Sequence, residues 1–119
     1  KNLNKMNISN KVVILEKNVF GGCENLNEIT IPYGMINIGD GAFEECKSLR
    51  EVSIPDSVAS IGDYAFWNCQ SLNQITVWSN VTSIGYSAFD GCKNLTIRAF
   101  KGSYAERYAL ENEIPFEEI

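Results

Sequence analysis

The stretch LREVSIPDSVASIGDYAFWNCQS, residues 49–71, decides the fold of this chain because its pattern recurs on both sides of it. Cys46 and Cys69 are 23 residues apart (69 − 46), and Cys23 and Cys92 continue the same interval. The same step relates Leu26, Leu49, Leu72 and Leu95; Ile38, Ile61 and Ile84; Gly39, Gly62 and Gly85; Ala42, Ala65 and Ala88; and Phe20, Phe43, Phe66 and Phe89. A strict period in the twenties predicts a solenoid, in which each repeat stacks on its neighbours.

The period divides the chain into repeats and an ending. Three repeats fall at residues 26–48, 49–71 and 72–94, and a degenerate one at 3–25 becomes visible when the register is carried back. We therefore predict four repeats over residues 1–94 and a C-terminal cap over 95–119. The first repeat is as apolar as an interior one at Leu3, Met6 and Ile8. It would therefore shield the end of a solenoid core poorly from water. We expect further repeats or domains upstream of Lys1 in the full-length protein.

Each repeat predicts the same local structures in the same order. The alternation in Glu51-Val52-Ser53-Ile54 indicates a strand with one buried face. Pro55 ends that strand, since proline cannot donate to a sheet. Gly62 is expected to permit a tight bend with positive φ, and the motif Ala-Phe-x-x-Cys after it favours a short helical turn. The predicted fold is an α/β solenoid with a parallel sheet on one side and short helical turns on the other.

After Cys92 the register breaks and a different signal begins. Ser103 reads as a helix N-cap, with Glu106 completing a capping box three residues later. An apolar helical stripe follows, formed by Tyr104, Ala105, Tyr108 and Ala109. Asn112 and Pro115 end it, and Ile114-Pro115-Phe116 predicts a short extended return. This segment is a helical cap over the last open face of the core.

Composition excludes several classes of function. The 119 residues include 10 Lys and Arg, 15 Asp and Glu and no His, for a formal charge of −5. An acidic chain without a basic patch has no electrostatic footprint for nucleic acid. No apolar run approaches the roughly 18 residues of a membrane span, so no membrane insertion is expected. No signal peptide is visible, and the start at Lys1 suggests a mature product or an excised fragment.

The four cysteines are expected to be core residues. Identical positions in successive turns lie about 4.8 Å apart, so the outer two cannot share a metal ion. The Cα atoms of cysteines in adjacent turns are close enough for a disulfide. Their side chains, however, are stacked in parallel and point the same way, so the two sulfur atoms do not face each other. Buried thiols acting as small apolar residues are therefore predicted, with no disulfide and no metal. A nucleophilic cysteine needs a base, and without histidine neither an enzyme nor a cofactor is expected.

The repeat pattern, Leu-x-x-Val-x-Ile-Pro-x-x-Val-x-x-Ile-Gly-x-x-Ala-Phe-x-x-Cys, resembles the BspA-like class of leucine-rich repeats. The resemblance is close over residues 26–94 and loose over 3–25, and the ending over 101–116 resembles the usual cap of that family. It implies a right-handed leucine-rich-repeat superhelix in a surface or secreted protein of bacteria or some protozoan parasites. The implied role is adhesion to host matrix proteins or other cells. The family supplies no universal catalytic or binding motif.

Two surfaces are candidates for binding. The outward strand positions form a polar column pair suited to a polar or basic partner: Glu28, Thr30, Glu51, Ser53, Gln74 and Thr76. The second is an aromatic patch of Tyr64, Trp67, Trp78 and Tyr86, in which Trp67 replaces the acidic residue of the neighbouring repeats and is expected to be exposed. These aromatics either contact sugar or protein or pack against a neighbouring module, and the polar face is either a recognition surface or merely solvated.

The sequence thus favours a non-enzymatic, extracellular or cell-surface module that binds a host or neighbouring-cell surface or matrix protein or a glycan. The alternative is a structural spacer or capping module of a larger surface protein, with no ligand of its own. The predicted sheet offers only a few hundred square ångströms, whereas a standard interface needs about 800 Å² per partner. Useful avidity would require a longer array or several copies.

Overall fold

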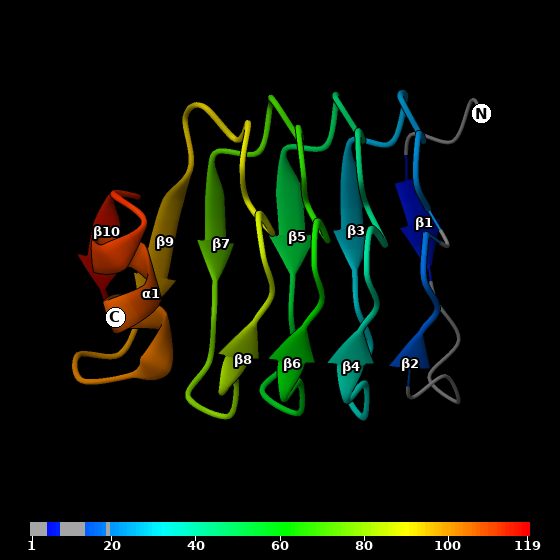
Figure 1. Cartoon of the computed structure of the whole chain (residues 1–119). Helices are drawn as coiled ribbons and strands as arrows, with labels where there is room; N and C mark the ends of the chain where they lie inside the picture. The colour runs from blue at the N-terminus through cyan, green and yellow to red at the C-terminus, as the bar shows by residue number, and fades with distance from the viewer. Residues whose placement is uncertain (1–4, 8–13, 19) are drawn as a thin grey trace.

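The computed structural model of the chain describes residues 5–7, 14–18 and 20–119, which wind into a solenoid with a helix at its C-terminal end (Figure 1). Its elements are β1 (Lys5–Asn7), β2 (Ile14–Leu15), β3 (Glu28–Thr30), β4 (Asn37–Ile38), β5 (Glu51–Ser53), β6 (Ser60–Ile61), β7 (Gln74–Thr76), β8 (Ser83–Ile84), β9 (Thr96–Ala99), α1 (Tyr104–Glu111) and β10 (Phe116–Glu118). The predicted parallel-sheet solenoid is confirmed.

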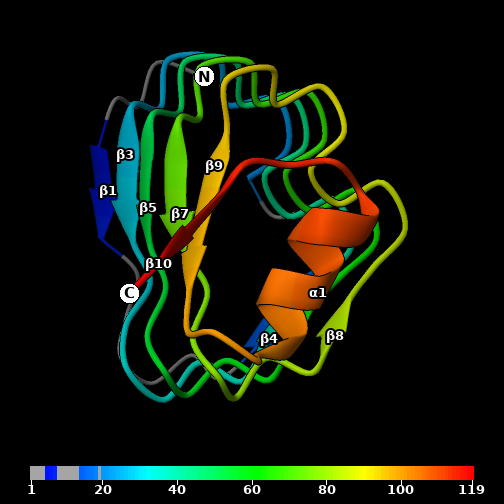
Figure 2. The same cartoon turned by 90° about the vertical axis from the view of Figure 1, so that its left-hand side faces the viewer.

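The strands form two parallel sheets that follow the 23-residue register. The large sheet has six strands in the order β1-β3-β5-β7-β9-β10, and the small sheet has four in the order β2-β4-β6-β8. Glu28 aligns with Glu51, and Ile38 aligns with Ile61, each one repeat apart. A third side, which we call the turn side, consists of residues 39–48, 62–71 and 85–94; it lies opposite the large sheet (Figure 2).

The degenerate repeat at 3–25 is described only in part. Leu3, Ile8, Val12 and Val19, which carried its register, lie outside the described residues. The described backbone keeps the predicted step, because Met6 in β1 aligns with Ile29 and Leu15 in β2 aligns with Ile38.

The small sheet was not predicted, and the turn side differs from the short helical turns that the sequence indicated. Within the described residues α1 is the only helix. The turn side has helix-like bonds from residue i to i−3, such as Cys46 N–H to Phe43 O at 3.1 Å. The amide of Phe43, however, donates to Ala65 O of the next repeat at 2.8 Å. Because such amides bond between repeats, they cannot form the i to i−4 ladder of a helix.

The glycine that follows Ile38, Ile61 and Ile84 is not needed for the positive φ that the sequence predicted. Gly62 and Gly85 do not have positive φ. A Cβ atom on Gly62 would instead lie 2.6 Å from the backbone nitrogen of Asp40 in the preceding repeat. Glycine is needed there because two backbones approach closely. The positive φ occurs two residues later, at 62° in Gly41 and 57° in Tyr64.

The core is a set of side-chain columns that run along the solenoid. The rings of Phe20, Phe43, Phe66 and Phe89 stack at centroid distances of 5.3, 5.2 and 5.3 Å. Tyr108 of α1 ends the column with an edge contact to Phe89 at 6.1 Å. Since Phe43 and Phe66 each have a ring of the adjacent repeat on either side, the apolar surface of one repeat is buried only when its neighbours are present.

The predicted helix forms with Ser103 as its N-cap, but the capping box differs from the prediction, because the Glu106 side chain accepts the amide of Gly102 and not that of Ser103. Ser103 Oγ accepts the amide of Glu106 at 3.2 Å, and Glu106 Oε1 accepts the amide of Gly102 at 2.7 Å. Ala105 and Ala109 are buried against the core. The extended return becomes β10, which adds a parallel strand to β9. The helix thus covers the last repeat while β10 extends the large sheet.

Candidate functional site

The outward residues of the large sheet form two straight columns. Glu28, Glu51 and Gln74 align with one another, and the column continues to Thr96. A second column runs through Thr30, Ser53, Thr76 and Arg98. We call the six predicted residues of these columns the sheet face. Glu28 and Thr76 are half-buried, whereas the other four side chains are exposed.

A half-open hollow of about 250 Å³ lies on the sheet face over β5 and β7. It is lined by Glu51, Val52, Ser53, Asn73, Gln74 and Thr76. Four of these are sheet-face residues, whereas Glu28 and Thr30 lie outside the hollow. The lining combines a carboxylate acceptor, two amides that donate and accept, and two hydroxyls. Such a set can bind a polar or positively charged group by several hydrogen bonds at once.

Asn73 lines this hollow, although the sequence reasoning did not select it. It precedes the strand β7 rather than belonging to it, so the alternation of strand residues gives no signal for it. The register offers one: Asn73 occupies the same repeat position as Arg50 and Asn27, and all three are polar. A polar residue at one position of every repeat could have been added to the columns on that ground.

The far end of the sheet face is occupied by the cap. Arg98 in β9 lies in the column of hydroxyl residues, and its Nε atom is 2.7 Å from Glu117 Oε1 of β10. This is an ion pair without hydrogen-bond geometry, because the buried Nε atom has no hydrogen-bond partner. The basic group at the end of the columns is therefore neutralised by the protein itself. The sheet face presents acidic, amide and hydroxyl groups to a partner.

The aromatic patch predicted from sequence separates into two places. Tyr64, Trp67 and Tyr86 lie together on the turn side, with Tyr64 in edge contact with Trp67 at 6.4 Å and with Tyr86 at 5.8 Å. We call these three the aromatic cluster. Trp78 is elsewhere: its Nε1 donates to Ile54 O at 2.7 Å, and its ring lies 6.1 Å from that of Phe100.

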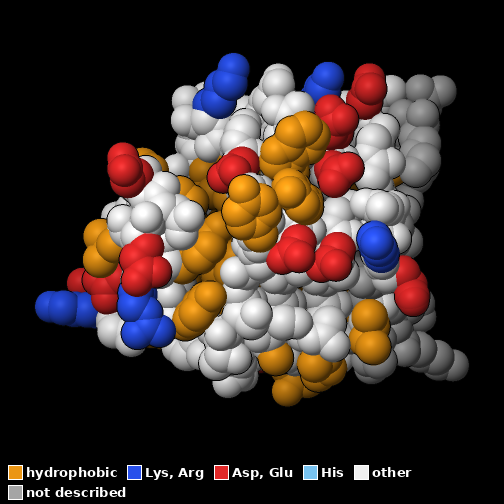
Figure 3. All heavy atoms as spheres, viewed as in Figure 1, with side chains coloured by type: hydrophobic (Ala, Val, Ile, Leu, Met, Phe, Trp, Pro, Cys, Tyr) orange, Lys and Arg blue, Asp and Glu red, His pale blue; other side chains and the backbone are white. Residues whose placement is uncertain are grey.

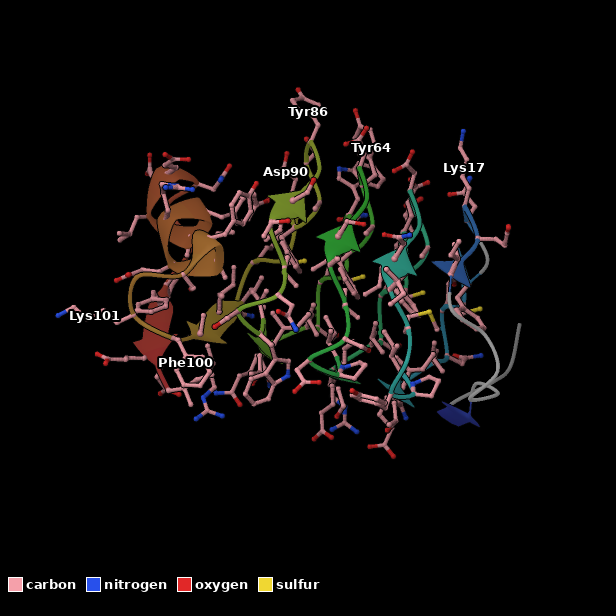
Figure 4. The ribbon with its side chains drawn as sticks, turned by 90° about the horizontal axis from the view of Figure 1, so that it is seen from below. Lys17, Tyr64, Tyr86, Asp90, Phe100 and Lys101 are labelled. Atoms are coloured by element: carbon pink, nitrogen blue, oxygen red, sulfur yellow. The ribbon has the colours of Figure 1, made fainter. Side chains whose placement is uncertain are left out.

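Exposure differs among the three rings of the aromatic cluster. Tyr86 is 73% exposed and Tyr64 is 40% exposed. Trp67 is half-buried rather than exposed as its replacement of acidic residues suggested, and its ring is in T-shaped contact with that of Tyr64. Figure 4 shows Tyr64 and Tyr86 projecting from the same side of the molecule.

Three of the four cysteines have the burial that the sequence predicted, and Cys92 does not. Cys46 and Cys69 are fully buried and Cys92 is half-buried. The Sγ atom of Cys69 donates to Phe43 O at 3.1 Å, and that of Cys92 donates to Phe66 O at 3.2 Å. Burial raises the pKa of the Cys69 thiol far above its usual range and that of Cys92 to about 12. These thiols are therefore protonated hydrogen-bond donors at neutral pH, not thiolate nucleophiles.

The geometry defines a class: a leucine-rich-repeat solenoid whose exposed surfaces are polar on the sheet and aromatic on the turn side. The chain belongs to the BspA type leucine-rich repeat family, whose six-copy repeat region it matches over residues 1–114. The comparison with curated proteins gave no match. Within the described residues, no helix is long and apolar enough to cross a membrane, and no three metal-ligating side chains are grouped as a metal site would require.

Two solved bacterial structures are similar to this chain. One is a leucine-rich cell surface protein from Faecalibacterium prausnitzii, with 28% identity and a TM-score of 0.60 over 89% of this chain. The other is a leucine-rich repeat protein from Bacteroides ovatus, with 25% identity and a TM-score of 0.54 over 98% of this chain. The chain spans only 34% and 42% of the lengths of those proteins.

Proposed function

We propose that this chain is an extracellular or cell-surface recognition module that uses its sheet face to bind a protein or glycan of a host or neighbouring cell. The observation that carries the proposal is the hollow over β5 and β7, where hydrogen-bonding side chains converge. Parallel side chains in register present equivalent groups at steps of about 4.8 Å. An extended chain of repeating polar groups fits such a surface.

The similarity to a leucine-rich cell surface protein supports the proposed location. The chemistry of the described residues supports binding without catalysis. The thiols are buried donors and the chain has no histidine, so a nucleophile paired with its usual base is missing. We propose that adhesion, rather than turnover of a substrate, is the role of the module.

Size limits the affinity of a single copy. Six strands of the large sheet span about 24 Å at the usual strand spacing, and each contributes only a few outward side chains. The face is smaller than the roughly 800 Å² that each partner buries in a standard interface. We therefore expect weak binding by one module and useful avidity when several are displayed together.

The test is binding of the multivalently displayed chain to arrays of extracellular-matrix proteins and glycans at physiological salt. The variant Glu51→Ala with Gln74→Ala removes one acid and one amide from the hollow. A matched control, Glu111→Ala with Gln70→Ala, removes the same groups from exposed positions off the sheet face. We expect a specific signal that the first variant loses and the control keeps.

Two outcomes would contradict the proposal. Equal loss in both variants would show that the signal reflects overall charge rather than the hollow. Absence of any signal, with the chain shown by circular dichroism to be folded, would favour the alternative role of a spacer or capping module in a larger surface protein.

A further inference from the structure

A second surface lies opposite the sheet face. On the turn side the ring plane of Tyr64 is nearly perpendicular to those of Trp67 and Tyr86, at 83° and 81°. Rings that meet at right angles form the walls of a corner rather than a flat stack. With Tyr86 73% exposed, most of its ring is open to solvent. Figure 3, which looks onto this side, shows hydrophobic side chains gathered near the middle with acidic side chains beside them.

Acidic residues flank Trp67 along its own repeat position. Glu44 and Asp90 occupy that position in the repeats before and after it. The backbone confirms that these repeats are in contact, because the amide of Asn68 donates to Asp90 O at 2.7 Å and that of Glu45 to Trp67 O at 2.7 Å. The backbone positions of Glu44 and Asp90 therefore lie about one strand spacing, roughly 4.8 Å along the solenoid, on either side of that of Trp67.

Tyr86 also continues an acidic column. Asp40 and Asp63 occupy its position in the two preceding repeats, and Asp63 Oδ1 accepts the backbone amide of Tyr86 at 2.8 Å. The Asp63 side chain is exposed. Its hydrogen bond to the backbone fixes the carboxylate beside the tyrosine. Two of the three columns of the aromatic cluster, those of Trp67 and Tyr86, thus carry acidic residues, whereas the column of Tyr64 carries none.

The repeat that carries Tyr64 and Trp67 lacks the lysine of its neighbours. Lys47 and Lys93 stand at one position of the adjacent repeats, where residue 70 is Gln. Gln70 donates to Asn68 Oδ1 at 3.2 Å and brings no positive charge. The repeat that carries Tyr64 and Trp67 thus has a neutral residue where its two neighbours have a cation.

Tyr64 also holds an unfavourable backbone conformation. Its φ of 57° is in the left-handed region, where the equivalent residues are Asn18, Gly41 and Ser87. Every repeat has positive φ at this position, so the conformation belongs to the repeat, but only here does a bulky residue, which is rare in that region, adopt it. The ring of Tyr64 contacts both other members of the cluster, so the strained residue is the one that organises the corner.

We propose that the aromatic cluster and its flanking carboxylates form a second binding site, which takes the Lys or Arg side chains of a basic segment of a protein partner. A cation is attracted to the faces of Trp and Tyr rings, and nearby carboxylates add Coulombic attraction. The chain itself places the guanidinium of Arg107 over the ring of Tyr104 at 5.7 Å. A neutral sugar would gain stacking from the rings and could donate hydroxyl hydrogen bonds to the carboxylates, but only a cation also gains the Coulombic attraction of the surrounding negative charge.

The site is tested by NMR titration of the whole chain with a short peptide of alternating glycine and arginine. The same peptide with citrulline in place of arginine keeps the shape and removes the charge. The indole N–H signal of Trp67 reports on the site, and that of Trp78, which is bonded to Ile54 O, serves as an internal reference. We expect the arginine peptide to shift the Trp67 signal alone and the citrulline peptide to shift neither.

Variants assign the binding to the cluster. Tyr86→Ala should weaken binding of the arginine peptide about two- to fivefold, the loss expected for one cation–π contact at an exposed site. Asp90→Asn should weaken it about two- to fivefold, as for one exposed ion pair. Tyr33→Ala is the matched control, because Tyr33 is 75% exposed and lies outside the cluster; it should change nothing. An unchanged Trp78 signal shows that each variant is folded.

Several results would overturn the proposal. If the citrulline peptide shifted the Trp67 signal as much as the arginine peptide does, charge would play no part in binding. If Tyr33→Ala weakened binding of the arginine peptide as much as Tyr86→Ala does, the binding would not be specific to the cluster. If the Trp67 signal does not shift even at about 10 mM arginine peptide, a concentration high enough to detect millimolar binding, the cluster binds no cation. A shift of Trp67 by maltotriose but not by the arginine peptide would assign the surface to carbohydrate instead. This site is independent of the sheet face, so either proposal can fail alone.

Discussion

Replacing Gly62 by alanine adds one methyl group at the closest backbone contact between two repeats. The new Cβ atom would lie 2.6 Å from Asp40 N and 2.8 Å from Gly39 C, and it would also meet Asp40 Oδ1. These backbone atoms cannot rotate away as a flexible side chain would. The two repeats must separate locally, and the bond from Asp63 N–H to Asp40 Oδ1, 2.8 Å long, is strained or lost.

The cost follows from two contributions. Overpacking of a well-packed interior costs about 1–3 kcal/mol, and losing a hydrogen bond to a charged acceptor costs about 1.5 kcal/mol or more. We expect Gly62→Ala to lower the free energy of unfolding by about 3 kcal/mol. That is a large fraction of the roughly 5–15 kcal/mol of a typical domain. With a urea m-value of about 1.5 kcal/mol/M, the midpoint should fall by about 2 M.

The assay is urea unfolding followed by circular dichroism, with Gly21→Ala as the matched control. Gly21 also lacks positive φ, and a Cβ there would lie 3.4 Å from its nearest neighbour, which is an ordinary contact. Its substitution should leave the midpoint unchanged or raise it slightly by restricting the unfolded chain. A Gly62→Ala protein as stable as the parent, or a Gly21→Ala protein equally destabilised, would refute the reasoning from close approach.

Two further predictions concern the core columns. Phe66→Ala, in the middle of the phenylalanine stack with ring neighbours at 5.2 and 5.3 Å, should cost about 3–5 kcal/mol; Phe66→Leu should cost much less in the same urea assay, and similar losses would contradict a packing origin. Because burial raises the pKa values of Cys69 and Cys92, the unfolded chain binds fewer protons than the folded one above about pH 9. Stability should therefore fall as pH rises from about 9 towards 12, by up to about 1.4 kcal/mol per pH unit for each thiol. Thermal melts between about pH 9 and 12 measure how stability changes with pH. If the stability of the parent did not fall with pH, and matched the profile of a Cys69→Ala variant, the prediction would be wrong.

The sequence by itself determined the path of the chain. A 23-residue period in apolar residues leaves one way to bury all of them, which is to align each repeat on the next. The register of Glu28, Glu51 and Gln74, the burial of the cysteines and the Ser103 cap follow from that pattern. Each depends on residues close in sequence or separated by a whole number of repeats, so no knowledge of side-chain packing was needed.

Only the tertiary structure determined the contacts between side chains and backbone atoms of different columns. The strands of the small sheet are two residues long, too short to produce a visible alternation. On the turn side, amides such as those of Phe43 and Glu45 donate to the next repeat, whereas the amides between them donate within their own repeat. The requirement for glycine at position 62 arises from the backbone of Asp40 and not from local conformation.

The same distinction applies to the candidate sites. The hollow between β5 and β7 includes Asn73 because adjacent side chains leave space there. Trp67 and Trp78 looked equivalent as departures from the repeat, yet one joins Tyr64 and the other packs with Phe100. Periodicity gives the position of a residue along its column, whereas contacts across columns depend on corner angles and ring orientations that the period does not encode.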